Sequence, residues 1–449
     1  MRQALPNGAA LVEFFSYKPF SAKSPIRAGA FGPARYVVYV LRKDGAPLGA
    51  DLGEGAVVDA SVARLLAALK CPQTVRDINQ CPAVAEVKRL ARDVDERLMR
   101  PVRRLTGDVR QVFLSPDGAL NLVPFAALVD EQGKYLVESY ALTYLTSGRD
   151  LLRLQVGSES RQAPLVVADP LFGLAHGAGS ATGGDGVEST RRSAEMRQMY
   201  FGRLAGTTAE GRSVGALLPG GQVLTQAQAT EVAIKQVAAP RVLHIATHGF
   251  FLPGQPQEAA AGTRGLVLGS SDAARAGGRF ENPLLRSGLA LEGANRRQGA
   301  GGEDGILTAL EAAGLDLWGT KLVVLSACET GVGEVKNGEG VYGLRRALVL
   351  AGSESQVMSL WQVADAATRD LMTAYYRLLL AGEGRTEALR QVQLEMLKGA
   401  GPAQAGSRRG VGAELGAAQV TDRRHPYYWA AFIQSGDWRG MQAQPAGAK

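Results

Sequence analysis

Two short segments of this chain share one pattern, and they constrain its fold more than any other feature. RVLHIATHGFF runs from Arg241 to Phe251, and KLVVLSACETG runs from Lys321 to Gly331. Each is an apolar stretch that leads into a reactive side chain, His248 in the first and Cys328 in the second. Such stretches are typical of buried parallel strands, and open α/β sheets collect their chemistry beyond the carboxyl ends of these strands. If the two strands are neighbours, an imidazole and a thiol meet there.

The length of the chain predicts two subdomains. With 449 residues, the chain exceeds the size at which a single hydrophobic core usually stops growing. A polar break over residues 157–163 separates a first half without histidine from a second half that holds both segments. We therefore expect a scaffold-like subdomain over residues 1–157 and a second subdomain over residues 163–442.

The order of the expected elements predicts an α/β fold with a mostly parallel sheet covered on both faces. The elements are strands over Ala10–Tyr17, Arg35–Arg42 and Pro164–Phe172, a strand, turn and apolar stretch over Val109–Val129, helices over Thr230–Val237, Leu307–Ala313, Gly340–Ala351 and Ala366–Leu380, strands that end at His248 and Cys328, a strand over Ser355–Val363, and a late strand or core segment over His425–Ile433.

One further helix is expected in the first half. Apolar residues repeat at helical spacing over Val87–Leu98 until Pro101 interrupts the pattern. Its many charged residues are interpreted as a solvated face rather than as a membrane or nucleic-acid surface.

Composition and the chain's N-terminal sequence indicate a cytoplasmic protein. No segment approaches the eighteen or so consecutive apolar residues of a transmembrane helix, and the first residues lack the apolar core of a secretion signal. The net charge of +7 comes from interleaved acids and bases, so neither nucleic acid nor membrane is expected as a partner.

The two cysteines of the first half, Cys71 and Cys81, are expected to be reduced and to be structural or incidental. With Cys328 they form an odd, sparse set without CxxC spacing, which supports neither a disulfide framework nor a zinc site. No metal or other cofactor is expected.

The residue pattern predicts nucleophilic catalysis by a thiol. A cysteine needs a nearby imidazole or a helix N-terminus to become a thiolate at neutral pH, and the N–H groups of Gly249 and Cys328 are candidates for stabilising an oxyanion. Simple packing of Cys328 stays open as an alternative, because free cysteine is among the most buried residue types. His244 is interpreted as a structural histidine, and His176 and His425 as incidental. The segments GxSxG, GxxxxGK[ST] and HExxH are absent from the sequence.

Several longer segments closely resemble the CHAT family of caspase-like proteins. They are HIATHGFF, LVVLSACETG, GEGVYGLRRALVLAG, MSLWQVADAAT, HPYYWAAFIQSGDW, LSPDGALNLVPFAALVD, TSGRDLL and LAGTTAEG, which together extend over nearly the whole chain.

The resemblance implies a caspase-like three-layer fold with a degenerate pseudo-caspase half before a catalytic half. It also implies a cysteine endopeptidase related to separase and metacaspases, with His248 and Cys328 as the catalytic dyad and no metal. Family members often carry TPR repeats upstream, and some cleave bacterial gasdermins or other defence effectors. A protein substrate and a TPR or other regulatory partner are therefore expected, and a short member or a catalytic fragment would both fit. The alternative is a non-enzymatic scaffold that binds a partner.

The resemblance also suggests pocket residues. Metacaspases have an aspartate two residues before the nucleophile, which binds a basic P1 side chain, whereas this chain has Ser326. An exclusive preference for Arg or Lys is therefore not expected, unless an acid such as Asp365 or Asp304 lines the pocket. Ser359, Trp361 and Asp365 are further pocket candidates; alternatively, Trp361 belongs to the core and Asp365 caps the next helix.

Overall fold

The computed structural model describes residues 1–23, 30–74, 80–174, 199–252, 283–326, 339–399 and 423–442. The N-terminal part of the chain begins with three strands and two long helices, followed by two strands separated by short helical turns. These elements are β1 (Ala9–Tyr17), β2 (Arg35–Arg42), β3 (Leu48–Glu54), α1 (Gly55–Thr74), α2 (Val84–Thr106), β4 (Gln111–Ser115), α3 (Leu136–Ser139), β5 (Ala141–Tyr144) and α4 (Asp150–Arg153), with 3₁₀ turns at Arg2–Ala4, Gly118–Leu122 and Phe125–Ala127.

The C-terminal part largely alternates strands with helices, as the sequence predicts, except that β9, β10 and β11 follow β8 without a described α-helix between them. Its elements are β6 (Leu165–Pro170), α5 (Ala205–Leu217), β7 (Gln222–Gln226), α6 (Glu231–Lys235), β8 (Val242–Ala246), β9 (Gly249–Phe251), β10 (Ser287–Ala290), β11 (Ile306–Thr308), α7 (Ala309–Ala312), β12 (Leu322–Leu325), α8 (Glu339–Leu350), β13 (Ser355–Ser359), α9 (Asp365–Leu380), α10 (Arg385–Leu397), α11 (Pro426–Trp429) and β14 (Phe432–Gly436), with 3₁₀ turns at Pro283–Leu285 and Ala300–Gly302.

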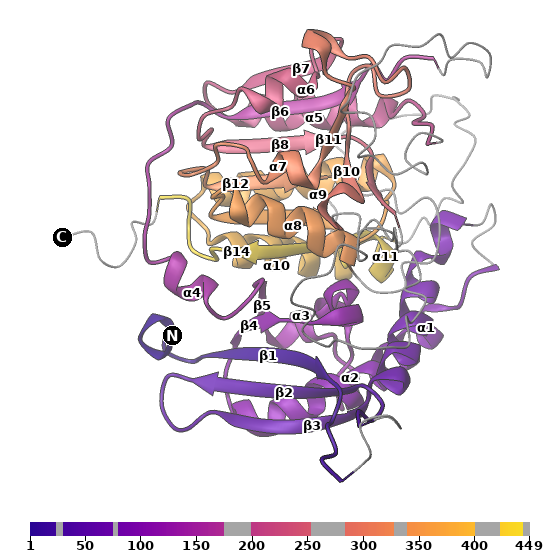
Figure 1. The fold of residues 1–449 in the computed structure, drawn as a ribbon, viewed down its shortest axis with the longest axis vertical. Helices are drawn as coiled ribbons and strands as arrows, with labels where there is room; N and C mark the ends of the chain where they lie inside the picture. The colour runs from indigo at the N-terminus through magenta and orange to yellow at the C-terminus, as the bar shows by residue number, and fades with distance from the viewer. Residues whose placement is uncertain are drawn as a thin grey trace, which may run out of the picture.

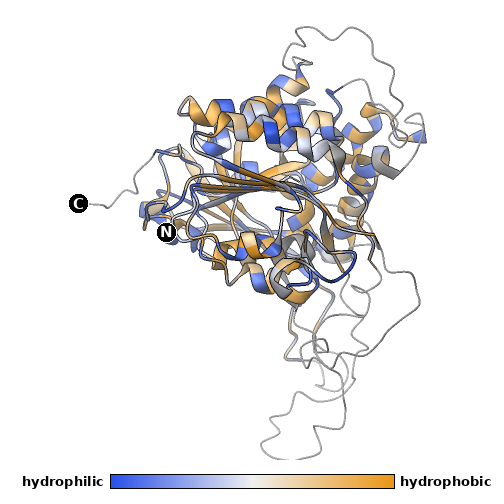
Figure 2. Cartoon of the chain, turned by 90° about the horizontal axis from the view of Figure 1, so that it is seen from above, coloured by the Kyte–Doolittle hydropathy of each residue, from blue (hydrophilic) through white to orange (hydrophobic). Residues whose placement is uncertain are grey.

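One sheet of eleven described strands runs through both parts, in the order β3-β2-β1-β4-β5-β14-β13-β12-β8-β6-β7 (Figure 1). Its central strands are parallel, except that β14 is antiparallel to β13. The last strand of the chain lies between the two parts, because β14 also pairs in parallel with β5. Helices cover the sheet from above and below (Figure 2), so the fold is the expected three-layer α/β arrangement with a mostly parallel sheet.

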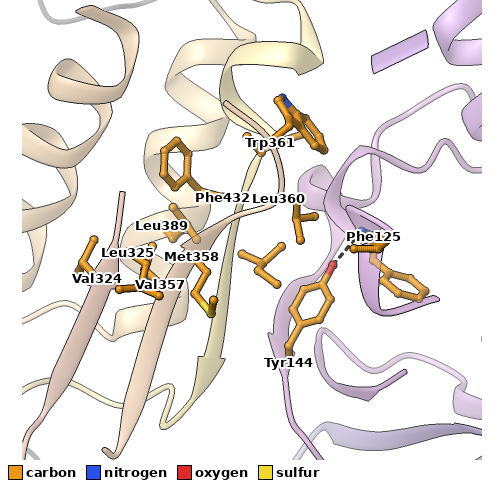
Figure 3. Close-up of a cluster of buried hydrophobic side chains, with 14 of the residues drawn as sticks. Phe125, Tyr144, Val324, Leu325, Val357, Met358, Leu360, Trp361, Leu389 and Phe432 are labelled. Carbon is orange, nitrogen blue, oxygen red and sulfur yellow. Dashed lines mark hydrogen bonds between the residues drawn. The ribbon is translucent and has the colours of Figure 1, made fainter. Parts of the chain in front are cut away.

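The hydrophobic core continues across the junction of the two parts. Side chains from β5, β12, β13 and β14 pack there side by side, together with Leu389 of α10 (Figure 3). Tyr144 closes this region on the N-terminal side, because its hydroxyl donates to the carbonyl of Val123 at 2.8 Å and accepts from the N–H of Phe125 at 2.9 Å. Burial of this phenol raises the pKa of Tyr144, so the hydroxyl stays protonated.

The helix predicted over Val87–Leu98 is α2, but the expected interruption at Pro101 was wrong, because the helix continues through it. The apolar stripe persists beyond the proline at Val102, which is buried. Arg103 also donates to both carboxylate oxygens of Asp95, at 2.7 and 2.6 Å, across the proline. A proline removes one helical hydrogen bond, and here tertiary packing and this buried ion pair compensate.

The expected helix over Leu307–Ala313 is also corrected at its start. Leu307 lies in β11, where it pairs with Leu289 of β10. The helix begins only at Ala309, and the hydroxyl of Thr308 caps it by accepting from the N–H of Glu311 at 3.2 Å. The alternating pattern of a three-residue strand is too short to separate from the helix that follows.

The sequence predicts reduced cysteines in the N-terminal part, and this prediction was wrong, because the two cysteines form a disulfide. Cys71 and Cys81 are bonded across 10 positions, with Cα atoms 5.6 Å apart. The packing of α1 on α2 brings these positions together, and that contact is not visible in the spacing of the cysteines.

None of the described helices is both long enough and apolar enough to cross a membrane.

Candidate active site

His248 lies where one strand leaves the main sheet for a smaller one. The preceding strand, β8, is buried along its whole length, as expected of a central strand. The residue directly after His248 begins β9, which joins β10 and β11 in a three-stranded antiparallel sheet. The imidazole therefore lies at the carboxyl end of a parallel strand, and its side chain is almost fully buried, with 5% exposure.

Among the described residues, a backbone carbonyl and two aromatic rings contact the imidazole of His248. Its Nε2 atom lies 2.7 Å from the carbonyl oxygen of Gly202. The rings of Phe172 and Phe201 lie 5.3 and 5.7 Å from the imidazole, centre to centre. Because a carbonyl oxygen only accepts, Nε2 carries a hydrogen, and Nδ1 is then the basic nitrogen of the neutral ring.

The segment that supplies Gly202 is fixed by an acidic residue that the sequence reading missed. Asp169 lies near the end of β6 with a φ of 46°, a left-handed conformation that is uncommon outside glycine. Its carboxylate accepts hydrogen bonds from Thr208 at 2.5 Å, from Gln226 at 2.5 Å and from Arg203 at 3.3 Å. Arg203 follows Gly202 directly, so this cluster anchors the backbone that orients the imidazole.

The strand that leads toward Cys328 is the direct neighbour of the strand that leads to His248. β12 and β8 are parallel, with Val324 opposite His244 and Leu325 opposite Ile245. The N–H of Ser326 extends this ladder by donating to the carbonyl of Ile245 at 3.0 Å. The two strands are therefore neighbours, which is the condition under which the sequence brings an imidazole and a thiol together. Cys328 itself lies outside the described residues, as does His176.

Gly249 has the orientation that a backbone donor needs. It pairs with Leu289 of β10, and the neighbouring pair carries the hydrogen bond from the N–H of Ala290 to the carbonyl of His248, at 2.9 Å. Hydrogen-bonded and non-hydrogen-bonded pairs alternate along an antiparallel ladder, so the N–H of Gly249 points away from β10.

A buried polar network lies below the strand ends. The hydroxyl of Ser326 donates to Oε1 of Glu210 in α5 at 2.5 Å. The same oxygen lies 3.2 Å from Nε2 of His244, whose Nδ1 is 3.1 Å from the hydroxyl of Tyr376 in α9. His244 is completely buried, and its Nε2 atom makes no hydrogen bond among the described residues, although it lies beside this carboxylate. The sequence reading missed Glu210, although it lies in the segment LAGTTAEG.

The CHAT domain model matches residues 88–437 of this chain, which is well over half of its length. This chain belongs to the CHAT domain family. It is also similar to human tetratricopeptide repeat protein 28, with 28% identity over 294 residues, which are 63% of this chain and 11% of that protein. The chain thus spans only a small part of that relative.

Two structures of the Saccharomyces cerevisiae separase–securin complex resemble the CHAT chain at 8% sequence identity. The TM-scores are 0.48 and 0.43, and the matches cover 97% and 96% of this chain and 30% of the other chain in each case.

The pocket candidates of the CHAT chain occupy different environments. Trp361 is completely buried in the core, where its indole N–H donates to the carbonyl of Tyr427 at 2.9 Å (Figure 3). Ser359 is the buried last residue of β13. Asp365 begins α9 and lies against Gly206 of α5. Of the three, Asp365 lies beside the helix that holds Glu210.

Two other residues named from the sequence have local structural contacts. The side chain of Asp304 accepts from the N–H of Ile306 at 3.0 Å in the turn before β11. Nδ1 of His425 accepts from the N–H of Tyr427 at 3.1 Å and caps α11. These bonds define the local turns on which the two side chains lie.

A carboxylate cluster in the CHAT chain has the residue types of a metal site. One oxygen from each of Glu231, Glu303 and Glu311 lies within 4.8 Å of the others. The ammonium of Lys235 already contacts all three, at 2.8, 2.8 and 3.1 Å. Burial works against this ammonium charge, but the three carboxylates raise the pKa of Lys235 overall, so a cation of the chain itself offsets part of the negative charge of the cluster.

A cleft of about 1040 Å³ lies between the N-terminal part and α8. Its described lining includes Phe15 and Asp117 on one side and Arg346 on the other. His248 is not among the described lining residues of this cleft.

Proposed function

We propose that this CHAT domain is a cysteine endopeptidase in which His248 activates the thiol of Cys328. The register between β8 and β12 carries the proposal. Leu325 lies opposite Ile245; Cys328 follows the former by three positions, and His248 follows the latter by three. Since the carboxyl ends of neighbouring parallel strands meet at one end of a sheet, equal spacing supports an imidazole beside a thiol.

The proposed reaction uses Nδ1 of His248 as the base, because the carbonyl of Gly202 fixes the hydrogen on Nε2. The thiol proton of Cys328 moves to Nδ1, and the sulfur attacks the carbonyl carbon of the scissile peptide bond. The C–N bond then breaks, the leaving amine takes the proton from the imidazolium, and water hydrolyses the thioester. The outward-pointing N–H of Gly249 supports a role in holding the oxyanion, with the N–H of Cys328 as the proposed second donor.

A thiol-directed peptidyl probe tests the dyad. We expect labelling of the chain that is lost in Cys328→Ala and strongly reduced in His248→Ala. Cys71→Ser/Cys81→Ser is the matched control, because it alters the other two cysteines and leaves Cys328 in place. Labelling that survives Cys328→Ala would sink the proposal.

A non-enzymatic scaffold that binds a partner is the alternative function, and the 5% exposure of His248 is the observation that favours it. A scaffold would bind its partner equally well with or without the dyad. Binding that is unchanged in Cys328→Ala, combined with no probe labelling of the wild-type chain, would decide for the scaffold.

The proposed substrate is a specific protein with an exposed loop, and a gasdermin-like pore former is the sharpest candidate from family analogy alone. Because Ser326 stands where metacaspases have an acid, we expect a P1 preference that is not restricted to Arg and Lys. Cleavage of a proteome-derived peptide library gives the P1 residue directly. A profile dominated by Arg and Lys would show that an acid such as Asp365 or Asp304 lines the pocket.

Three further features belong to the proposal. The chain divides into pseudo-caspase and catalytic halves over residues 1–157 and 163–442, which the strand order β1–β5 and β6–β14 supports. A TPR-containing or other regulatory partner is proposed from the family, and the similarity to a tetratricopeptide repeat protein fits it.

A cytoplasmic location is proposed from the sequence, although disulfides are rare there. Recovery of an intact Cys71–Cys81 bond from thiol-trapped cells would count against that location.

A further inference from the structure

One buried carboxylate contacts both strands that lead to the proposed dyad. Glu210 is 2% exposed, and its Oε1 atom meets the hydroxyl of Ser326 at 2.5 Å and Nε2 of His244 at 3.2 Å. Ser326 directly follows β12 and precedes Cys328 by two positions, and His244 lies in β8 four positions before His248. Glu210 therefore bridges the two strands from the helix that covers them.

The contacts around Glu210 are close, but Nε2 of His244 makes no hydrogen bond among the described residues, although it lies 3.2 Å from the carboxylate. Nδ1 of His244 and the hydroxyl of Tyr376 share a hydrogen bond at 3.1 Å. Burial, together with the charges of Tyr375 and Glu210, raises the pKa of Tyr376 well above its ordinary value, so its proton is retained. A buried carboxyl group is tolerated where it is hydrogen-bonded, and the hydroxyl of Ser326 supplies such a bond to Glu210.

The same stretch of chain also orients the imidazole. Gly202 accepts from Nε2 of His248 at 2.7 Å, and α5 begins three residues later, at Ala205. One continuous stretch, from Gly202 to Glu210, thus contacts the imidazole at one end. At its other end it contacts His244 in β8 and Ser326 just after β12. A shift of α5 would change the position of Ser326 relative to His248.

We propose that Glu210 is a positioning residue, which sets the place of Ser326, and through it the backbone leading to Cys328, relative to the imidazole of His248. The proposal rests on the function proposed above. Misplacement of reacting groups by about 1 Å can cost on the order of 100-fold in rate, so loss of the carboxylate is expected to slow the chemical step.

Peptide cleavage tests the proposal through the separate values of kcat and KM. Glu210→Ala is expected to lower kcat by about tenfold or more while KM changes by less than about threefold. Glu210→Gln keeps the size of the side chain and one acceptor oxygen for Ser326, and it is expected to restore most of kcat. Rates are taken per folded molecule, from urea unfolding of each variant.

Glu231→Ala is the matched control. Glu231 is an equally buried glutamate, with 1% exposure, in the same part of the chain, but its described partners are Lys235 and the N–H of Gly305. It is expected to lose stability without a change in kcat per folded molecule. An equal fall of kcat in both variants, or unchanged kcat in Glu210→Ala, would overturn the positioning role.

Alkylation of Cys328 separates this proposal from the peptidase proposal. The rate of modification by iodoacetamide, followed by mass spectrometry of the Cys328 peptide, requires no peptidase activity. Glu210→Ala is expected to change this rate by about fivefold or more at pH 7, and Glu231→Ala is expected to leave it unchanged. Equal alkylation rates in wild type and Glu210→Ala would overturn the positioning role, even if the wild type cleaves peptides. If the wild type cleaves no peptide but Glu210→Ala alters the alkylation rate, only the peptidase proposal is overturned.

Discussion

Phe172, Phe201 and Gly202, which contact the imidazole of His248, come from outside its own strand. Phe172 follows β6, and Phe201 and Gly202 precede α5. Both phenylalanine side chains are 3% exposed, so they exclude water from the imidazole face that they contact. At the scale of single residues, the reactivity of His248 therefore depends on packing as well as on its own chemistry.

Phe201→Ala tests this dependence. Loss of a buried phenylalanine is expected to lower the free energy of unfolding by about 3–5 kcal/mol. We also expect peptidyl-probe labelling per folded molecule to slow by about tenfold, because the imidazole gains freedom. Urea unfolding and the rate of labelling measure the two effects.

Phe14→Ala is the control for that variant. Phe14 is also 3% exposed, but it packs on Phe125 in the N-terminal part of the chain. A comparable loss of stability with unchanged labelling is expected there. If Phe14→Ala slows labelling as much as Phe201→Ala does, the ring of Phe201 has no special role at the imidazole.

At the scale of elements, the close approach of α5 to α9 depends on a glycine. A Cβ atom added at Gly206 would overlap the carboxylate of Asp365. The two helices can pack this closely only while position 206 has no side chain. Since α5 also holds Glu210 and follows Gly202, its position affects the whole site.

Gly206→Ala is expected to displace α5 and to lower both stability and probe labelling, although alanine is the better helix former. Asp365→Gly in the same chain removes the overlapping atoms and is expected to restore part of both. A double-mutant cycle measures this coupling. Independent, additive effects of the two changes would contradict the steric explanation.

The disulfide between α1 and the segment before α2 gives a second prediction at this scale. Cys71→Ser/Cys81→Ser is expected to lower the free energy of unfolding by about 2–3 kcal/mol, because a loop of 10 positions is no longer closed in the unfolded chain. Cleavage by the folded protein is expected to stay nearly intact. Loss of cleavage in the folded variant would mean that the N-terminal part is more than a scaffold.

Strand order and helix contacts differ in how well the sequence predicts them. The apolar patterns of the sequence predicted β1, β2 and α8, because burial imposes their periodicity. The edge strand β3 was missed because its sequence, LGADLGE, is rich in glycine and has little β-propensity. Glu210 and Gly202 were missed because their roles arise only when α5 packs on the sheet, and no local pattern marks such contacts.

At the scale of the whole molecule, an ion-pair network joins the two parts at the end of the sheet away from His248. Asp437 follows β14, and its carboxylate lies 3.2 Å from Arg385 and 2.9 Å from Arg439. Arg439 also donates to the carbonyl of Leu154 at 2.8 Å. The ring of Trp438, between these residues, lies 4.5 Å from that of Phe113 in β4.

The pH dependence of stability is expected to contain a contribution from Asp437. Burial opposes its charged form, but hydrogen bonds from Arg439 and the charge of Arg385 lower the pKa of Asp437 below its ordinary value. A carboxyl group with a lowered folded-state pKa stabilises the fold above its unfolded pKa of about 3.9, and this stabilisation is lost as the pH falls through the folded value.

Asp437→Asn is therefore expected to be less stable than wild type by a constant amount between about pH 5 and pH 7, with the difference shrinking below about pH 4. Urea unfolding at each pH measures it. If the difference in the free energy of unfolding between wild type and Asp437→Asn is the same at pH 7 and pH 3, the charge of Asp437 is not the cause of the lost stability.

The bond between Cys71 and Cys81 sets a practical condition on every assay of this protein. A catalytic thiol is normally protected from oxidation with dithiothreitol, yet the same reagent would open the only described covalent cross-link of the N-terminal part. A preparation that keeps Cys328 competent could therefore have a loosened scaffold, and one that keeps the scaffold closed could have an oxidised nucleophile. Serine at positions 71 and 81 leaves the scaffold without this cross-link in every buffer, so adding dithiothreitol to that variant changes the state of Cys328 alone.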